Sequence, residues 1–367
     1  MCFGTRPEAI KMASLVHELQ KSGKLIVEIC VTAQHREMLD QVLDFFEIIP
    51  HYDLDIMKKS QTLNELSGRV FLGLDKVFAE ANPDIVLVHG DTTTSSVCAW
   101  AAFHRGIKVG HIEAGLRTFD KCSPFPEEIN RQVTGRIADF HFAPTSISSR
   151  NLLTEKINPD NILITGNTVI DSLLWTKKKL DHHFENFRIR ELKHKLDFTK
   201  KIILVTGHRR ENFGDGFLNI CKALIKIAES TEVEIVYPVH LNPNVQQPVV
   251  ELLSGISNIH LIEPLDYPSF VWMMSNSYFI ITDSGGVQEE APSLGKPVLV
   301  MRNTTERPEA VEAGTVILVG TDSQKIVSEA EKLLNNDEEY NKMKQKHNPY
   351  GDGKASQRIR EFLENTI

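Results

Sequence analysis

The chain has 367 residues, which exceeds the size of a single hydrophobic core and therefore predicts two domains. Its 41% hydrophobic and 25% charged residues are typical of a globular protein in water, and no apolar run approaches the ~18 residues of a membrane span. The net charge of −8 argues against a protein that binds nucleic acid.

The five cysteines are scattered and include no C-x-x-C pair; they are Cys2, Cys30, Cys98, Cys122 and Cys221. This usage suits buried thiols in a reducing cytoplasm and argues against a zinc ribbon. The N-terminus lacks the layout of a signal peptide. We therefore expect a cytoplasmic protein that binds neither membrane nor metal.

In the first half of the chain, short apolar runs rich in β-branched residues predict strands at 25–33, 84–90, 108–112 and 161–166. Helical patterns lie between them. One begins near Pro7 and ends before Gly23. Another keeps an apolar stripe over Leu63, Leu66, Val70, Leu74 and Val77.

A charge-rich stretch without a strand pattern, residues 168–200, predicts the junction between the domains. A second series of strands follows at 201–207, 232–239, 258–264, 278–283 and 296–302, and residues 354–366 read as a last helix. Apolar strands alternating with helices indicate parallel sheets that helices cover on both faces. We expect two Rossmann-like α/β domains, with ligands bound beyond the carboxyl ends of the strands in a cleft between the domains.

Polar and ionisable residues follow many of these strands, in GTRPEAIK (4–11), TAQHRE (32–37), HGDTTTSS (89–96), HIEAGLR (111–117), GHRREN (207–212), PVHLNPN (238–244) and DSGGVQEE (283–290). Each signal alone is weak, because a lone histidine is more often a core residue and SGG is common turn chemistry. Ordinary capping does not call for histidine and arginine at several strand ends. No stretch matches a zinc, P-loop or G-x-G-x-x-G pattern, which argues against metal and dinucleotide cofactors.

Three stretches suggest chemistry more specifically. Ser284-Gly285-Gly286 lies between a buried strand and a helix, an arrangement that directs backbone N–H groups at an anion. In KCSPFPEEINRQ (121–132), Glu127 enters a helix beside two prolines; it is either a helix-stabilising acid or a catalytic carboxylate. Arg307 precedes Pro308 in a loop after a strand, as a phosphate clamp would.

Taken together and in order, the motifs of this chain resemble those of the bacterial non-hydrolysing UDP-N-acetylglucosamine 2-epimerases over essentially the whole chain. These motifs are FGTRPEAIKMA, TAQHREML, HGDTTT, HIEAGLRT, PEEINR, TGNTVID, GHRREN, DSGGVQEEAPSLGKPVLVMR and TERPEAVEAGT. The resemblance implies a GT-B-like pair of domains, residues 1–168 and a UDP-binding 169–353, with the helix 354–367 returning to the first. It also implies a homodimer that needs no cofactor and interconverts UDP-N-acetylglucosamine and UDP-N-acetylmannosamine for surface polysaccharides.

Carried over by position, the resemblance assigns catalysis to Asp91, Glu113, Glu127 and His208. Around the nucleotide it places Arg6, Lys11, Phe270, Ser284, Gly285, Gly286, Glu290 and Arg307. Glu290 follows the glycines by about one helical turn and can accept the ribose hydroxyls, whereas Asp283 and Glu289 read as structural. Loss of UDP and of the proton on carbon 2 would give 2-acetamidoglucal, and re-addition from the other face would give the epimer.

Some family members bind a second UDP-N-acetylglucosamine as an activator, and Gln34, His35, Glu37, Arg209 and His240 lie in the matching motifs. The sequence departs from the family in two places: only Met1 and Cys2 precede FGTRPE, and Leu265 stands where some members have glutamine. Four other functions stay open. They are a hydrolysing epimerase, an epimerase of a modified sugar, a GT-B glycosyltransferase and a nucleotide-sugar sensor without turnover.

Overall fold

The computed structural model describes residues 1–33, 36–58, 61–230 and 232–367. The chain forms two compact units, and the N- and C-terminal segments belong to the same one. Unit 1 comprises Met1–Trp175 and Tyr350–Ile367, and unit 2 comprises Thr176–Pro349. Within the described ranges, no helix is both long enough and apolar enough to cross a membrane.

Unit 1 is an α/β unit in which every strand pairing is parallel. Its strands are β1 (Cys2–Phe3), β2 (Cys30–Val31), β3 (Tyr52–Asp53), β4 (Ile85–His89), β5 (Lys108–Ile112), β6 (Phe140–Ala143) and β7 (Ile162–Ile164), ordered β1-β2-β3 and β4-β5-β6-β7, and β1 lies beside β4. Its helices are α1 (Arg6–Gln20), α2 (Arg36–Phe45), α3 (Leu63–Ala81), α4 (Thr93–His104), α5 (Glu127–Ile137), α6 (Ser146–Thr154) and α16 (Ala355–Thr366). Helix α7 (Thr168–Asp181) begins in unit 1 and ends in unit 2.

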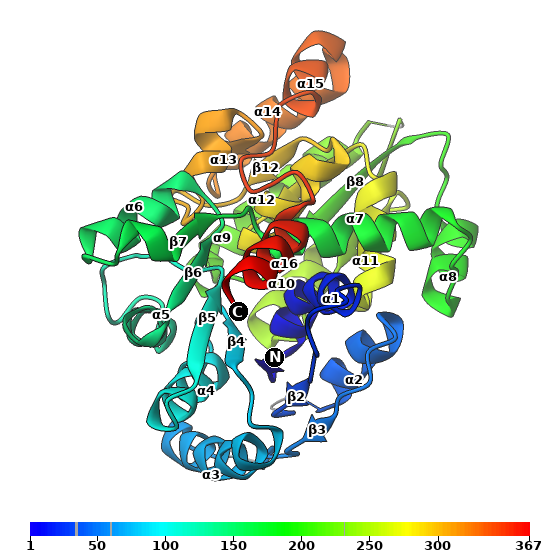
Figure 1. Cartoon of the computed structure of the whole chain (residues 1–367). Helices are drawn as coiled ribbons and strands as arrows, with labels where there is room; N and C mark the ends of the chain where they lie inside the picture. The colour runs from blue at the N-terminus through cyan, green and yellow to red at the C-terminus, as the bar shows by residue number, and fades with distance from the viewer. Residues whose placement is uncertain (34–35, 59–60, 231) are drawn as a thin grey trace. The chain divides into compact units, whose positions relative to one another are not determined.

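Unit 2 is built around one parallel sheet in the order β10-β9-β8-β11-β12-β13 (Figure 1). The strands are β8 (Lys201–Thr206), β9 (Val233–Pro238), β10 (Ile259–Ile262), β11 (Phe279–Thr282), β12 (Val298–Val300) and β13 (Val316–Leu318). The helices are α8 (Phe187–Lys195), α9 (Asp215–Ala228), α10 (Pro243–Leu253), α11 (Tyr267–Asn276), α12 (Gly285–Glu290), α13 (Pro308–Ala313), α14 (Ser323–Asn335) and α15 (Asp337–Lys344). The strand order reverses between β8 and β11, and such a switch point is where open α/β sheets bind ligands.

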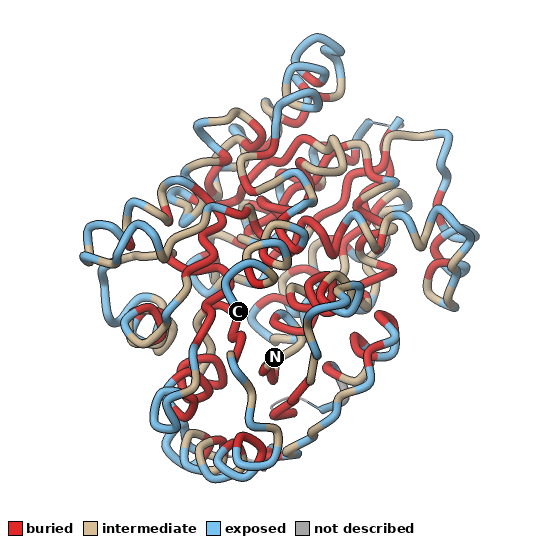
Figure 2. Tube along the Cα trace, in the orientation of Figure 1, coloured by how far each residue is buried: buried red, intermediate tan, exposed pale blue. Residues whose placement is uncertain are grey.

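Many of the buried hydrophobic residues of both units lie in their strands, and buried residues are red in Figure 2. In unit 2, Ile203, Val205 and Ile281 pack with Phe217 of α9 beneath the sheet. Strands buried on both faces read as unbroken apolar runs, and this is why the sequence identified β4, β5 and β8 to β12. The predicted fold class, parallel α/β in two units, is confirmed.

Helix α16 is tied into unit 1 through its first turn. The carboxylate of Asp171 in α7 accepts the N–H groups of Ala355 and Ser356 at 3.2 and 2.8 Å. Just before the helix, the carbonyl of Tyr350 accepts the N–H of Asn167 at 2.7 Å. The helix packs on α1 (red on blue in Figure 1). A carboxylate from a distant part of the sequence thus caps a helix whose own N-cap, Lys354, provides no side-chain bond.

The predicted strand 25–33 is wrong in length, since only Cys30–Val31 pair. Their neighbour β1 has just two residues, so residues 25–29 have no longer strand beside them, and Ile26 is 95% exposed. The sequence analysis missed β3, β6 and β13, which have two to four residues each; β3 (YD) and β6 (FHFA) carry a polar residue that interrupts an apolar run. The last predicted helix, 354–366, is confirmed as α16.

Candidate active site

Glu113 lies at the centre of the polar cluster beyond the carboxyl ends of β4 and β5. Its Oε1 accepts Lys11 Nζ at 2.6 Å and Asn167 Nδ2 at 2.8 Å. Its Oε2 lies 3.4 Å from His89 Nε2. Glu113 is 8% exposed, and a charge so deeply buried is stable only with partners of this kind.

The backbone fixes this carboxylate as firmly as its partners do. Glu113 has a φ of 62°, in the left-handed region that residues other than glycine seldom adopt. Gly90 has a φ of 63°, and a Cβ added there would lie 3.3 Å from Glu113 Oε2. The HGD stretch therefore needs a glycine both for its turn and for the space that Glu113 occupies.

Asp91 is the second carboxylate of the cluster and is anchored by α5. Arg131 Nη2 donates to Asp91 Oδ2 at 2.6 Å, and Asn130 Nδ2 donates to the Asp91 carbonyl at 3.0 Å. Burial raises the pKa of Asp91, while Arg131 acts in the opposite direction. The charges of Glu113 and Glu127 raise this pKa further, so the three predicted carboxylates lie close enough to interact.

The two adjacent glutamates of PEEINR have different surroundings. Glu127 is the first residue of α5 and is partly exposed. Glu128 is fully buried, and its carboxylate accepts the N–H groups of Thr118 and Phe119, both at 3.0 Å. Glu128 thus anchors the loop before α5, and this leaves Glu127 as the member of the pair suited to chemistry.

The GTRPE turn before α1 is held by Glu8, whose carboxylate accepts the N–H groups of Gly4 at 3.0 Å and Thr5 at 2.8 Å. Thr92, next to Asp91, donates its hydroxyl to Glu8 Oε1 at 2.6 Å. Arg6 is the first residue of α1 and is partly exposed. The turn that carries Arg6 is therefore fixed to the loop that carries Asp91.

In unit 2, Asp283 organises the turn that carries His208. Its Oδ2 accepts the N–H groups of His208 and Arg209 at 2.9 and 2.8 Å and Asn212 Nδ2 at 3.2 Å. Asp283 follows β11 and His208 follows β8, so the two flank the switch point of the sheet. The Asp283 carboxylate is fully buried and holds the turn that carries His208 in place.

His208 is partly exposed, and its ring stacks on that of His240 with centroids 5.5 Å apart. Burial lowers the pKa of His208, the nearby Asp283 acts against this shift, and the neighbouring His240 and Arg209 add to it. His208 is therefore a neutral imidazole at pH 7, which provides hydrogen bonds without a fixed charge.

The glycines 285 and 286 open α12 beside two arginines. A Cβ added at Gly285 would lie 3.7 Å from Arg209 Nη2 and 4.0 Å from the Arg307 guanidinium. Arg307 also forms an ion pair with the buried Glu289 through its Nε. The N–H of Ser284 is bonded to Thr282 Oγ1 at 2.9 Å. The N–H groups at the glycines and the two guanidinium groups together suit an anion such as a diphosphate.

Glu290 lies at the end of α12, and its side chain turns back toward the start of the helix. Tyr267 donates its hydroxyl to Glu290 Oε1 at 3.3 Å, and a Cβ added at Gly286 would lie 3.7 Å from Glu290 Oε2. Phe270 lies one turn beyond Tyr267 on α11. A fixed carboxylate next to an anion-binding turn is suited to accept a pair of hydroxyls.

The sequence analysis missed Asn167, Arg131, Glu8 and Tyr267. Asn167 stands in the quoted TGNTVID and Arg131 in PEEINR, where its spacing of four residues from Glu127 was a usable signal. Gln34 and His35, predicted for a second sugar-nucleotide site, lie outside the described residues, as does the side chain of Glu37.

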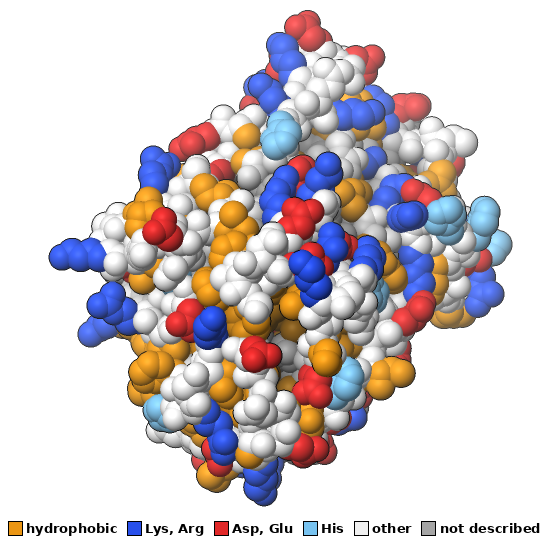
Figure 3. Space-filling model, viewed as in Figure 1, with side chains coloured by type: hydrophobic (Ala, Val, Ile, Leu, Met, Phe, Trp, Pro, Cys, Tyr) orange, Lys and Arg blue, Asp and Glu red, His pale blue; other side chains and the backbone are white. Residues whose placement is uncertain are grey.

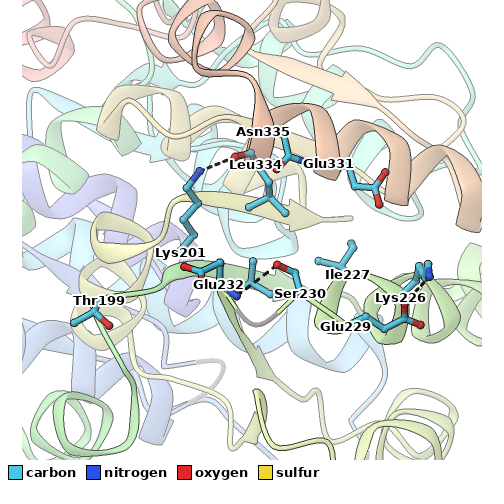
Figure 4. Close-up of a pocket in the computed structure, with 11 residues that line it drawn as sticks. Thr199, Lys201, Lys226, Ile227, Glu229, Ser230, Glu232, Glu331, Leu334 and Asn335 are labelled. Carbon is cyan, nitrogen blue, oxygen red and sulfur yellow. Dashed lines mark hydrogen bonds and ion pairs between the residues drawn. The ribbon is translucent and has the colours of Figure 1, made fainter.

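A cavity of about 530 Å³ in unit 2 lies elsewhere, at the amino ends of β8 and β9 (Figure 4). It is lined by Thr199, Lys201, Lys226, Ile227, Glu229, Ser230, Glu232, Val233, Glu331, Leu334 and Asn335. Lys201 donates to the Leu334 carbonyl and Lys226 pairs with Glu229, so both cations already have partners. In the described ranges, no three His, Cys, Asp or Glu side chains are placed to hold a metal ion.

The fold and these clusters define a class of protein, namely two-unit α/β proteins with a GT-B-like architecture that act on nucleotide sugars. The chain belongs to the UDP-N-acetylglucosamine 2-epimerase family, whose pattern it matches over residues 17–364.

Individual relatives agree over nearly the full length. A UDP-N-acetylglucosamine 2-epimerase of Salmonella typhimurium is 57% identical over 363 residues, covering 98% of this chain and 96% of the relative. The crystal structure of the Neisseria meningitidis UDP-GlcNAc 2-epimerase bound to UDP-GlcNAc superposes with a TM-score of 0.91 at 51% identity, covering 100% of this chain and 99% of that one. The Methanocaldococcus jannaschii enzyme in complex with UDP-GlcNAc and UDP gives a TM-score of 0.80 at 35% identity, covering 99% and 98%.

Proposed function

We propose that this chain is an isomerase that interconverts UDP-N-acetylglucosamine and UDP-N-acetylmannosamine at carbon 2 without releasing free sugar. Membership of the family over the full chain supports the activity. The observation that carries the chemistry is the cluster of Asp91, Glu113 and Glu127, with Lys11 bonded to Glu113. A protein that only bound a nucleotide sugar would have no use for three interacting carboxylates.

The proposed route begins with elimination. Because the hydrogen on carbon 2 is not next to a carbonyl, its removal alone would give an unstabilised carbanion. The bond from carbon 1 to the diphosphate oxygen breaks with its electron pair going to UDP, and a carboxylate takes the proton from carbon 2. This leaves 2-acetamidoglucal and UDP. Re-addition of UDP to carbon 1 and of a proton to the other face of carbon 2 gives the epimer.

We assign the proton transfers to unit 1 and most of the nucleotide contacts to unit 2. Asp91 and Glu127 are the proposed acid–base pair, and Glu113 positions or exchanges the proton. Arg6, Lys11, His208, Arg307 and the N–H groups of Ser284, Gly285 and Gly286 are assigned to the diphosphate; Glu290 and Phe270 are assigned to the nucleoside. For Ser284 this assignment requires its bond to Thr282 to open.

Proton NMR of UDP-N-acetylglucosamine with the purified protein in D₂O tests this function. The expected result is UDP-N-acetylmannosamine with deuterium at carbon 2 and the UDP retained. Free N-acetylmannosamine would identify a hydrolysing epimerase instead. Unchanged substrate, in a sample shown by calorimetry to bind UDP, would contradict the proposal and direct attention to a modified sugar, a glycosyltransferase reaction or a sensor.

We further propose that the protein is a cytoplasmic homodimer that supplies surface polysaccharide synthesis. The exposed apolar side chains of α3 and α4 support the dimer: Leu72 is 72% exposed, Trp100 44% and Phe103 60%. Large apolar side chains gathered on adjacent helices commonly mark an interface.

Activation by a second UDP-N-acetylglucosamine, with Arg209 and His240 among its ligands, also stays a proposal. A sigmoidal rate curve, and a reverse reaction that needs a trace of UDP-N-acetylglucosamine, would support it. Hyperbolic kinetics in both directions would remove it.

A further inference from the structure

His89, the last residue of β4, has a role in the site that the mechanism above does not use. It is 3% exposed, and its Nε2 is buried without a hydrogen-bond partner among the described residues. Oε2 of Glu113 lies 3.4 Å from this nitrogen. A buried nitrogen left unpaired destabilises a fold, so its retention calls for an explanation.

The two oxygens of Glu113 face different side chains. Oε1 accepts Lys11 Nζ and Asn167 Nδ2, and Oε2 faces His89 Nε2 at 3.4 Å. Hydrogen bonds around catalytic groups are often long without substrate and shorten in the reacting complex. A shift of a few tenths of an ångström would turn this approach into a hydrogen bond.

The charge state of His89 permits this bond. Burial lowers the pKa of His89 to about 4; the carboxylate of Glu113 acts against the shift and Lys11 adds to it. The ring is therefore neutral at pH 7 and can carry its single proton on Nε2. The charge of Glu113 also acts on Asp91, whose pKa it raises.

We propose that His89 is a positioning residue that donates its Nε2–H to Oε2 of Glu113 and so fixes the plane of that carboxylate during the reaction. The inference rests on the proposed function, in which Glu113 takes part in proton transfer. With Oε1 bonded to Lys11 and Asn167 and Oε2 bonded to His89, the carboxylate cannot rotate about its last side-chain bond. Such rigidity favours the transition state over the bound substrate.

Two substitutions of His89 separate donor placement from packing. The amide nitrogen of glutamine reaches close to the position of Nε2, whereas that of asparagine reaches only the position of Nδ1. His89→Gln is therefore expected to keep kcat within about threefold of the original. His89→Asn should lower kcat by roughly 10- to 100-fold, the effect of one lost hydrogen bond to a charged group, with KM and UDP affinity within about twofold.

His141→Asn is the matched control, because His141 is also a buried histidine on a strand of unit 1, 1% exposed, with an unpaired Nδ1. It should lower the melting temperature while leaving kcat unchanged. Equal loss of kcat in His89→Gln and His89→Asn, or full activity in His89→Asn, would overturn the proposal. Equal loss in His141→Asn would show that any lost buried histidine has the same effect.

A second readout does not depend on turnover. In protein labelled with ¹⁵N-histidine and saturated with UDP, the imidazole Nε2–H of His89 should give a protected NMR signal. The signal should vanish in His89→Asn and shift in Glu113→Gln. If it is present in a protein that fails to epimerise, the proposed function fails while the His89 contact stands. Absence of the signal in an active protein contradicts the contact.

Discussion

The left-handed backbone of Glu113 is unusual at the scale of the single residue, because a φ of 62° costs a side-chain-bearing residue about 1–2 kcal/mol. Strain of this kind persists where surrounding contacts require one geometry. Here Lys11 and Asn167 bond one oxygen, and Gly90 leaves room for the other. Glu113 is thus held in one orientation before substrate arrives.

Gly90→Ala should disturb that orientation. The new Cβ would lie 3.3 Å from Glu113 Oε2 at a backbone φ of 63°, so we expect kcat to fall about 10-fold or more while calorimetry shows unchanged UDP affinity. Gly106→Ala is the control: its φ is 70°, but an added Cβ would have no atom within 4 Å. Equal kcat in the two variants would contradict the argument.

Asp283→Ala should affect the other unit. Removing the carboxylate leaves the N–H groups of His208 and Arg209 and the amide of Asn212 without their acceptor, which we expect to cost about 3 kcal/mol or more in unfolding free energy. UDP affinity, measured by calorimetry, should fall by at least about 10-fold, because the turn that carries His208 loosens.

Glu234→Ala provides the comparison, since Glu234 is a buried acid of the same sheet that pairs with Lys200 and His260 and takes no part in the candidate site. Glu234→Ala should lower the unfolding free energy of the unit without lowering its affinity for UDP. If both variants lower the affinity for UDP equally, general destabilisation of the unit causes the loss of affinity.

At the scale of elements, the sequence predicted best where an element is long and buried. The unbroken apolar runs of β4, β8 and β11 identified the strands, and the rule that parallel strands bind ligands at their carboxyl ends led to Asp91, His208 and Asp283. Asn167 and Tyr267 could not be found in that way. Each acts from a helix or helix entry whose neighbours only the folded chain determines, and no spacing in the sequence encodes such an approach. For Arg131 the spacing of four residues from Glu127 was a signal, but its bond to Asp91 follows only from the folded chain.

The first turn of α16 offers a prediction about an element. Asp171→Ala removes the acceptor for two buried N–H groups, and we expect a loss of about 1–3 kcal/mol in the unfolding free energy of unit 1 by urea denaturation.

Asp352→Ala, in the same C-terminal segment, breaks the exposed pair with Arg358, which lowers the pKa of Asp352 to about 2, and an exposed bond from the N–H of Lys354 at 3.2 Å. Exposed pairs contribute about 0–1 kcal/mol, so this variant should be nearly as stable as the original. An equal loss of unfolding free energy in both variants would mean that the buried Asp171 cap stabilises the unit no more than the exposed pair does.

Helix α15, outside the candidate site, carries charges of both signs. Its acids lie in the first turn and its lysines in the last turn, and the helix is at the top of Figure 3. Lys342 pairs with Glu338 and Glu339. This arrangement complements the helix dipole.

For the whole molecule, three buried histidines of unit 1 link stability to pH. Burial lowers the pKa of His89 and His141 to about 4 and that of His111 to about 3. Between pH ~6.5 and these values the unfolded chain binds protons that the folded chain does not, so stability falls as the pH falls through this window. Glu8 and Asp91, whose pKa values burial raises, act in the opposite direction at the acid end.

His141→Gln isolates one of these contributions. Burial lowers the pKa of His141 to about 4, whereas glutamine, a polar side chain of similar reach, does not titrate. We expect the melting temperature of the variant to rise relative to the original by several degrees between pH 7 and pH 5. A difference that stays constant with pH would show that His141 is not buried in its neutral form.

The proposed dimer makes a prediction about assembly. Light scattering should give twice the chain mass of 41.5 kDa, and Phe103→Glu should give the single mass because a charge enters the apolar face. Phe187→Glu, at a 68% exposed position of α8, should leave the mass unchanged. Monomeric original protein, or dimeric Phe103→Glu, would contradict this placement of the interface.

The order of segments along the chain has a consequence during synthesis. Unit 1 is closed by Tyr350–Ile367, which a ribosome makes after all of unit 2, whereas unit 2 is complete at Pro349. The usual rule that domains fold from the N-terminus onward therefore cannot apply here. On a ribosome, the unit that holds the proposed catalytic carboxylates stays incomplete while the unit encoded in its middle has already emerged. Chaperones would meet the first half of this chain, with β4 and its neighbours exposed, before they meet any other part.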